Sequence, residues 1–410
     1  KFAENGKMHI AHNAGMTIGS HGLELTTNGL ITIDNTPNGA GFLKVDPLAA
    51  NKPTNKVKIN YTTCAYDSGS QRNEIWQYMG APVSGLSYTI DNNTVIYYWN
   101  EEKGWVKERN TVNLTPFVGY ALTQKYPGVV RTFVGQMIRE NKDINLTYTS
   151  GGMNGDNLFV NSYLAPINMT TITESDWVDT EDKANKTFYL FNSGSWNQWQ
   201  DALKENNSDT TGVRDNSPGH YYAIPAFGAK YLTEDDQIVI PSMQGVYVAR
   251  QSGSKPVQLK LNYRKHVWNY GGDFDKDLTL IREVDMNRPM RVVNNERAAI
   301  KRVRVHVYGL NSGADRAYII EKQGCSQGYD NGYDAENIFV DNLVNIYTQE
   351  EFGQMEVSFS DDIDSTYIGL AAGVDSVYTL TIGALEGKGL YLRDLANDSV
   401  MPLSDGLRYT

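Results

Sequence analysis

Short apolar alternations dominate the first part of the chain. Pairs of apolar residues two positions apart, such as Met8/Ile10 and Ile31/Ile33, recur every seven to ten residues between Gly- and Asn-rich turns. Because side chains alternate between the two faces of a strand, each pair predicts a strand of three to four residues. Strands this short and regular favour a β-solenoid-like segment over residues 1–70, in which each strand forms one side of a coil. A tight meander is the alternative.

A weak internal repeat organises residues 71–255. The first copy contains IWQYMGAPVSGL, VIYYWNEEKGWV and LTPFVGYAL, and the second contains NLFVNSYLAPINMT, TFYLFNSGSWNQW and VIPSMQGVYV. Each copy places Ala-Pro after an apolar strand, where proline is tolerated because it lacks the N–H that a central ladder needs. We predict a β-rich domain in which both copies share one strand arrangement. The helical candidate SWNQWQDALKEN is then a peripheral insertion in the second copy.

Period-two patterns continue to the C-terminus. QLKLNY, RVRVHVYG, RAYIIEK, MEVSFS, YTLTIGAL and GLYLRDL alternate apolar and polar residues, with almost no helical periodicity between them. Such a run of strands predicts a C-terminal antiparallel β-sandwich over residues 256–410. The expected fold is therefore all-β: a short N-terminal β-solenoid-like segment followed by antiparallel β-sandwich domains.

Composition and charge narrow the classes of function. The 410 residues are 40% hydrophobic and 21% charged, which is typical of a folded chain of two or three domains. A net charge of −11 argues against a nucleic-acid partner, because phosphate binding needs a basic face. The basic piece KRVRVH at 301–306 alternates with valine and is interpreted as the solvated face of one strand. Cys64 and Cys325 are expected to be separate thiols, with a bridge as the alternative.

Two Gly-Tyr-Asp units stand side by side in SQGYDNGYDAENIF, residues 326–339. Clustered carboxylates such as Asp330 and Asp334 can bind Ca²⁺, but Gly332 stands where an EF-hand starting at Asp330 requires an oxygen ligand. Glycine also supplies a positive φ, and Asp and Asn side chains bond nearby N–H groups in tight turns. We expect a turn, with a calcium clip as the alternative. Apart from calcium, no cofactor is indicated.

A second acidic stretch, GGDFDKDLTL, places Asp273, Asp275 and Asp277 at alternate positions. In an extended conformation their three carboxylates share one face and repel one another unless solvent or a cation lies there. The EF-hand numbering breaks twice in this stretch. A solvated loop is expected, with a cation site as the alternative.

Aromatic residues offer candidate ligand-binding positions. Flat exposed rings cover the apolar face of a pyranose, and Trp196 and Trp199 lie three apart in a polar setting of Asn, Gln and Ser. Tyr97 and Trp99 are predicted on one strand face with Tyr98 on the other. Core packing is the alternative for each of these rings. The chain contains no nucleophile elbow, Walker loop or dinucleotide fingerprint, so we expect no enzyme, although glycosidase carboxylates on separate strands leave no local motif.

Several motifs resemble one family of large cell-surface proteins from Bacteroidetes bacteria. TTNGLITID resembles the Gly/Asn-rich segments of that family, and WQYMGAPVSG, YYWNEEKGWV, LTPFVGYAL and IPSMQGVYV match its modules in the same order. The C-terminal match is GADRAYIIEKQGCSQGYDNGYDAENIF. The loop WNYGGDFDKDLTLIREVDMNRPM departs from the pattern as an insertion.

The resemblance implies an extracellular, surface-exposed protein with an adhesin-like or structural role and no catalytic residues. Its partner would be an extracellular protein or a glycan, and a glycan-binding module of a nutrient-capture system is the alternative function. A hydrolase with unrecognised carboxylates is the third. Outer-membrane anchoring through a segment outside this chain is a further expectation.

Overall fold

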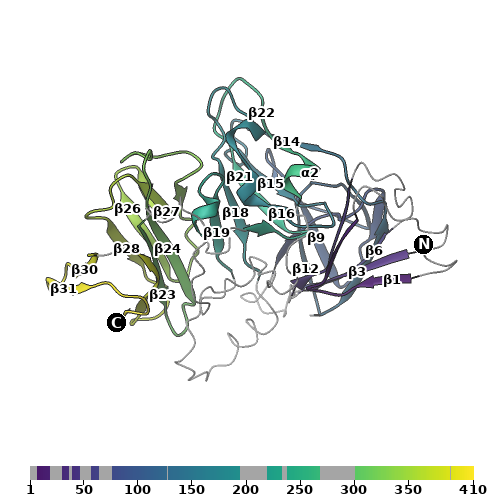
Figure 1. The fold of residues 1–410 in the computed structure, drawn as a ribbon. Helices are drawn as coiled ribbons and strands as arrows, with labels where there is room; N and C mark the ends of the chain where they lie inside the picture. Colours follow the sequence, from purple (N-terminus) through teal and green to yellow (C-terminus); the bar gives the residue numbers. More distant parts are fainter. Residues whose placement is uncertain are drawn as a thin grey trace. The chain divides into compact units, whose positions relative to one another are not determined.

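A computed structural model of the chain describes residues 7–18, 30–36, 39–46, 57–63, 76–126, 128–193, 219–232, 238–267, 301–387 and 389–410. Within these residues strands predominate, and helices are single turns such as α2 (Tyr263–His266) (Figure 1). The all-β class predicted from the sequence is confirmed. The chain divides into two compact units, Lys1–Asn197 with Gln237–Arg282 and Gln198–Asp236 with Glu283–Thr410.

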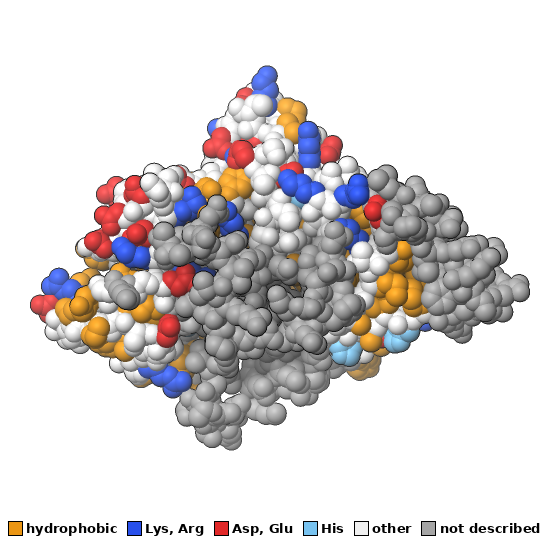
Figure 2. All heavy atoms as spheres, in the orientation of Figure 1, with side chains coloured by type: hydrophobic (Ala, Val, Ile, Leu, Met, Phe, Trp, Pro, Cys, Tyr) orange, Lys and Arg blue, Asp and Glu red, His pale blue; other side chains and the backbone are white. Residues whose placement is uncertain are grey.

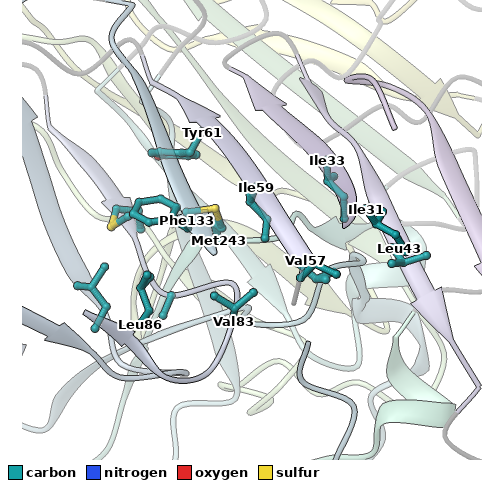
Figure 3. Close-up of a cluster of buried hydrophobic side chains, with 14 of the residues drawn as sticks. Ile31, Ile33, Leu43, Val57, Ile59, Tyr61, Val83, Leu86, Phe133 and Met243 are labelled. Atoms are coloured by element: carbon teal, nitrogen blue, oxygen red, sulfur yellow. The ribbon is translucent and has the colours of Figure 1, made fainter. Parts of the chain in front are cut away.

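Parallel pairing joins the N-terminal strands of the first unit. The strands are β1 (Lys7–Ile10), β3 (Leu30–Thr36) and β6 (Val57–Thr62) in one stack, and β2 (Gly15–Ile18) with β5 (Phe42–Val45) in another. In the first stack, β13 (Val130–Gly135) pairs antiparallel with β6, and the short β4 (Gly39–Ala40) pairs with β3. Ile31, Ile33, Val57 and Ile59 alternate with polar residues and point into one buried cluster (Figure 3).

The length of one of these strands corrects the expectation. β1, β2 and β5 have 4 residues each, as the apolar pairs predict, whereas β3 has 7 because polar residues such as Asn35 continue its ladder with β6. Parallel stacking of the described strands fits the predicted segment. A solenoid coil stays a prediction, since the connections at 19–29 and 47–56 lie outside the described residues.

The two copies of the internal repeat share one topology. In the first copy the order across the main sheet is β7–β12–β9–β10, and β8 pairs with β11. In the second copy the order is β15–β21–β18, and β16 pairs with β20. The bounds are β7 (Gln77–Met79), β8 (Leu86–Thr89), β9 (Thr94–Asn100), β10 (Gly104–Lys107), β11 (Thr111–Leu114) and β12 (Tyr120–Gln124), then β15 (Asp156–Val160), β16 (Ile167–Asn168), β18 (Thr187–Phe191), β20 (Val239–Ile240) and β21 (Gly245–Ala249).

The two prolines of the repeat also lie in matching environments. Pro82 and Pro166 are both buried and each follows a buried alanine. A further sheet, β14 (Lys142–Leu146), β22 (Val257–Leu261) and β17 (Trp177–Val178), completes the first unit. β22 thus lies with the first unit, although the sequence placed residues after 255 in the C-terminal domain. The piece SWNQWQDALKEN, predicted as a helical insertion, lies outside the described residues.

The two copies meet at a junction that leaves no room for side chains. A Cβ on Gly119 of the first copy would lie 2.3 Å from Cγ of Leu158, and a Cβ on Gly245 of the second would lie 2.6 Å from Cβ of Tyr78. When Gly119 is aligned with Gly245, Tyr78 and Leu158 are aligned as well. Each of them pairs with the residue two positions after the junction glycine of its own copy, on β12 and β21 respectively. The contacts are reciprocal, so the two copies are related by an approximate two-fold axis at this junction.

Each copy also inserts a large side chain at this junction. Phe117 and Met243 stand two residues before the junction glycines and adopt left-handed backbone conformations, with φ of 64° and 68°. Bulky residues rarely adopt this conformation unless packing enforces it. The Phe117 ring meets Tyr163 of the second copy at 5.1 Å, whereas Met243 lies in the cluster that holds Phe133 of the N-terminal stack (Figure 3). The copies therefore share their cores.

One mixed sheet forms most of the second unit, in the order β28–β26–β27–β24–β23–β29–β32, with β25 paired to β27 and a hairpin of β30 and β31. β24 and β27 run parallel, which corrects the predicted antiparallel sandwich. β23 and β26 touch although two strands separate them in the sheet, so the sheet curls around its core and the sandwich-like class fits. The bounds are β23 (Arg302–Tyr308), β24 (Ala314–Glu321), β25 (Ala335–Glu336), β26 (Asn345–Glu350), β27 (Gly353–Ser360), β28 (Tyr367–Ala371), β29 (Thr379–Glu386), β30 (Tyr391–Asp394), β31 (Ser399–Pro402) and β32 (Arg408–Tyr409).

Charged and apolar side chains are distributed unevenly on this unit. Figure 2 shows acidic and basic side chains interspersed over much of it, with hydrophobic ones gathered at the end that carries β30 and β31. Tyr391 and Val400 of this hairpin are 64% and 60% exposed. The hairpin therefore stands outside the core that Val305 and Ile346 help to form.

The basic alternation KRVRVH does not face solvent, which corrects the interpretation from sequence. Arg302, Arg304 and His306 are 5%, 7% and 0% exposed, while the valines between them fill the core on the opposite face. Residues 219–232, which include β19 (Tyr221–Pro225), cover the arginine side. Arg302 donates to the carbonyl of Tyr231 at 3.0 Å and pairs with Glu386 at 2.9 Å. A segment distant in sequence thus buries a face that the local pattern left open.

We predict that Gly119→Ala lowers the free energy of unfolding of the first unit by about 1–3 kcal/mol, because the added methyl group collides with Leu158. Urea denaturation followed by circular dichroism measures the change. Gly328→Ala is the matched control: its nearest contact would be Ser326 Oγ at 3.6 Å, so a change below about 0.5 kcal/mol is expected. Equal stability of both variants would show that the junction tolerates a side chain.

Candidate functional site

The outward side of the first-copy sheet carries a row of aromatic residues. Strand alternation places Tyr78, Tyr97, Trp99 and Trp105 on this side, while Ile96 on the opposite side enters the core. Antiparallel register sets Trp105 directly opposite Trp99. Trp76, two residues before Tyr78, extends the row, and we call these five residues the aromatic face.

Ring contacts join the aromatic face in two groups, Trp105 with Trp99 and Tyr78, and Trp76 with Tyr97. Trp99 and Trp105 lie 5.0 Å apart at 70°, Tyr78 and Trp105 lie 5.5 Å apart, and Trp76 and Tyr97 lie 5.6 Å apart. Edge-to-face and tilted geometries of this kind suit the quadrupoles of aromatic rings. Trp105 is 38% exposed and the other four rings are half-buried. A ligand can therefore reach Trp105 while its neighbours hold it in place.

Residues of the second copy contact the side chains of the aromatic face. Trp99 Nε1 donates to the carbonyl of Asp156 at 2.6 Å, and Phe191 packs on Tyr78 at 5.1 Å. The buried Glu101 carboxylate accepts the N–H groups of Thr149 and Gly155, both at 3.0 Å, and so fixes the loop before β15. Hydrogen bonds and packing of this type hold a binding surface in one geometry before any ligand arrives.

A tight hairpin turn presents Trp105. Asn100 Oδ1 accepts the N–H groups of Glu102 and Lys103, and Gly104 has a φ of 74°, which glycine adopts without steric cost. The turn brings Trp99 and Trp105 into register. The sequence prediction for Tyr97, Trp99 and Tyr98 agrees with this register, since Tyr98 packs on the core cluster. Tyr78 and Trp105 were missed, although the hairpin pattern WNEEKGW could have revealed Trp105.

The candidate pair Trp196 and Trp199 lies outside the described residues, as do Asp273, Asp275 and Asp277. Their roles in ligand or cation binding stay predictions. Cys64 also lies outside the described part, whereas Cys325 is a buried free thiol whose pKa is raised to about 11 by burial.

Asp330 and Asp334 build a turn through backbone hydrogen bonds. Asp330 Oδ2 accepts the N–H of Ser326 at 2.5 Å, and the two carboxylate oxygens of Asp334 accept the N–H groups of Asp330 and Phe359, both at 2.7 Å. These bonds are those expected of a turn built by aspartate side chains. Groups of three or more metal-ligating side chains are absent from the described residues. A calcium clip stays a prediction that chelation would test.

This turn has a second partner that sequence reasoning missed. Gly332, with a φ of 87°, presents its carbonyl to the N–H groups of Phe227 and Gly228 at 2.8 and 3.0 Å. A Cβ at Gly332 would lie 2.5 Å from the Phe227 ring. The turn therefore docks residues 219–232 onto the sheet of the second unit. No local signal links these segments, which stand about a hundred residues apart.

Burial perturbs the acids around this contact. Desolvation raises the pKa of Asp334 to about 7, against the lowering effect of its two backbone hydrogen bonds. Desolvation also raises the pKa of Glu356, whose carboxylate accepts the N–H of Ala223 at 3.0 Å. The same cause raises the pKa of Asp315 and lowers that of His220, which faces it. Residues 219–232 are thus held by buried acids.

Comparison with known proteins gives one informative similarity. No family model matches the chain, and no solved structure matches it. The chain is similar to the minor fimbrium subunit Mfa5 of Porphyromonas gingivalis, with 28% identity over 418 residues. The match covers 94% of this chain and 32% of Mfa5, so the chain spans about a third of that relative's length.

This similarity is consistent with a Bacteroidetes surface protein, as the motifs predicted. Among the described residues, no helix is long and apolar enough to cross a membrane.

We predict that the turn at Asp334 loses stability as pH rises. Its pKa is higher in the folded chain than the ordinary value of 3.8, so its contribution is complete below about pH 4 and is lost as pH rises through about 7. Each unit of pKa difference corresponds to about 1.4 kcal/mol, which limits the loss to about 4 kcal/mol. Hydrogen exchange of the Asp330 and Phe359 amides, corrected for intrinsic rates, measures it. Asp334→Asn should flatten the profile, and an unchanged slope would contradict the assignment.

Proposed function

We propose that this chain is a structural, adhesin-like part of a bacterial cell-surface protein. The observation that carries the proposal is the similarity to a fimbrium subunit across 94% of the chain. In this role the chain works outside the cell through contacts with fimbrial or other extracellular components, and it has no enzymatic step. Anchoring to the outer membrane through a segment outside this chain is part of the proposal.

Long-range ties in the first unit support a structural role. The buried Lys44 ammonium donates to the carbonyl of Val267, and Asn35 donates to the carbonyl of Ser242 at 3.0 Å. These bonds join the N-terminal stack to residues more than 200 positions later. Contacts between distant parts of a chain make these parts unfold cooperatively. Cooperative unfolding suits a structural component, because no part of the unit unfolds before the others.

We predict that the protein is accessible on intact cells. An epitope tag inserted at Gly128, whose position is open to solvent, should be removed when intact cells of the native bacterium are treated with a protease. Immunoblotting measures the loss, and a periplasmic protein that survives the treatment is the control for cell integrity. A tag that is protected until the cells are lysed would contradict a surface location.

A second candidate function is glycan binding at the aromatic face. The observation that favours it is the exposed Trp105, held by Trp99 and Tyr78 on a surface that both copies support. A flat indole ring can cover the apolar face of a pyranose, and burying it contributes strongly to binding. The proposal of a surface component does not depend on this candidate.

We predict that Trp105→Ala abolishes glycan binding if this candidate is right. A glycan array with the purified chain should give signals that fall at least tenfold in the variant, because hot-spot aromatic residues contribute about 2 kcal/mol or more. Tyr126→Ala is the matched control, since Tyr126 is exposed but lies outside the aromatic face. An array without signal from the wild-type chain would remove this candidate.

A further inference from the structure

Lys107 shares the outward side of β10 with Trp105. The two residues are two positions apart, and the register sets Trp105 opposite Trp99 and Lys107 opposite Tyr97. The Lys107 ammonium lies 6.0 Å from the centre of the Tyr97 ring. This contact holds the exposed cation over the aromatic face, beside the accessible indole.

Lys107 carries a charge that the described part of the chain does not neutralise. Lys186 pairs with Asp182 at 2.6 Å, and Lys301 pairs with Glu321 at 2.5 Å. No carboxylate among the described residues forms such a pair with Lys107. Lys107 differs from other lysines of the described residues in its position, because it shares one side of β10 with the exposed Trp105.

Two acids near the Trp99 end of the aromatic face, Glu101 and Asp156, are already engaged. Glu101 is buried and accepts two backbone N–H groups, and the carboxyl group of Asp156 bonds to the hydroxyl of Tyr247. Asp156 meets the aromatic face through its carbonyl, which accepts the N–H of Trp99. These two carboxyl groups therefore leave Lys107 free to attract an external anion.

We propose that the aromatic face binds an acidic glycan, with Trp105 against a pyranose ring and Lys107 against the carboxylate or sulfate that the sugar carries. This inference rests on the glycan-binding candidate and adds the charge of the ligand. An ammonium and an anion form a charge-assisted bond, while the ring of the same sugar supplies the apolar surface that the indole covers. A neutral sugar satisfies only the second contact.

The test uses the complete chain and three oligosaccharides of equal length: a galacturonic acid oligomer, a sulfated galactose oligomer and a neutral galactose oligomer. Calorimetry gives each Kd at low and high salt. The wild-type chain should bind one or both acidic oligomers roughly three- to tenfold more tightly than the neutral one, and this preference should shrink as salt rises. The two acidic oligomers separate a carboxylate from a sulfate ligand.

Two variants and one control assign the contacts. Lys107→Met should reduce acidic binding to the neutral level and leave neutral binding unchanged, whereas Trp105→Ala should remove both. Lys125→Met, which alters another lysine placed over a tyrosine ring, should change neither. Circular dichroism shows that each variant is folded.

Equal binding of neutral and acidic oligomers would overturn the inference and leave the glycan candidate standing. Binding of none of them would remove both. A polyglutamate peptide that binds as tightly as the acidic sugars, with no loss in Trp105→Ala, would show charge attraction alone and would also overturn it.

Discussion

Two glycines allow the backbones of the repeat copies to touch. At Gly119 and Gly245 any side chain would occupy space held by the other copy, and Phe117 and Met243 adopt strained conformations close by. Such strain persists only where surrounding packing compensates for it. Here the compensation comes from cores that the copies share. The copies therefore depend on one another, although each has its own set of hydrogen-bonded strands.

The aromatic face inherits its geometry from this junction. Trp99 is fixed by a backbone carbonyl of the second copy, and Tyr78 is packed against both Gly245 and Phe191. A surface formed by one copy alone would lack these supports. Sharing of this kind explains how a short hairpin can present Trp105 and Lys107 in fixed positions, and how a change at the junction would reach the aromatic face.

The second unit depends on a different constraint, the burial of charge. In sequence, residues 219–232 lie between β18 and β20 of the second copy. They cover the side of β23 that carries arginines. Buried charges are tolerated only with partners: the Tyr231 carbonyl and Glu386 bind Arg302, and the Tyr222 ring lies 4.6 Å from the guanidinium of Arg316 on the adjacent β24. The GYDNGYD turn completes the cover by binding Phe227 and Gly228.

The sequence by itself determined what depends on neighbouring residues: period-two strands, the Ala-Pro strand ends, the turn at Asp330 and Asp334, and the shared side of Tyr97 and Trp99. Local hydrogen bonding and side-chain alternation set these features. Only the tertiary structure decided the parallel pairing of β24 with β27, the burial of Arg302 and Arg304, and the meeting of Trp105 with Tyr78. These features join strands that are distant along the chain. A local pattern does not indicate which strand or segment it will contact, because the same alternating strand can have a solvated or a covered face.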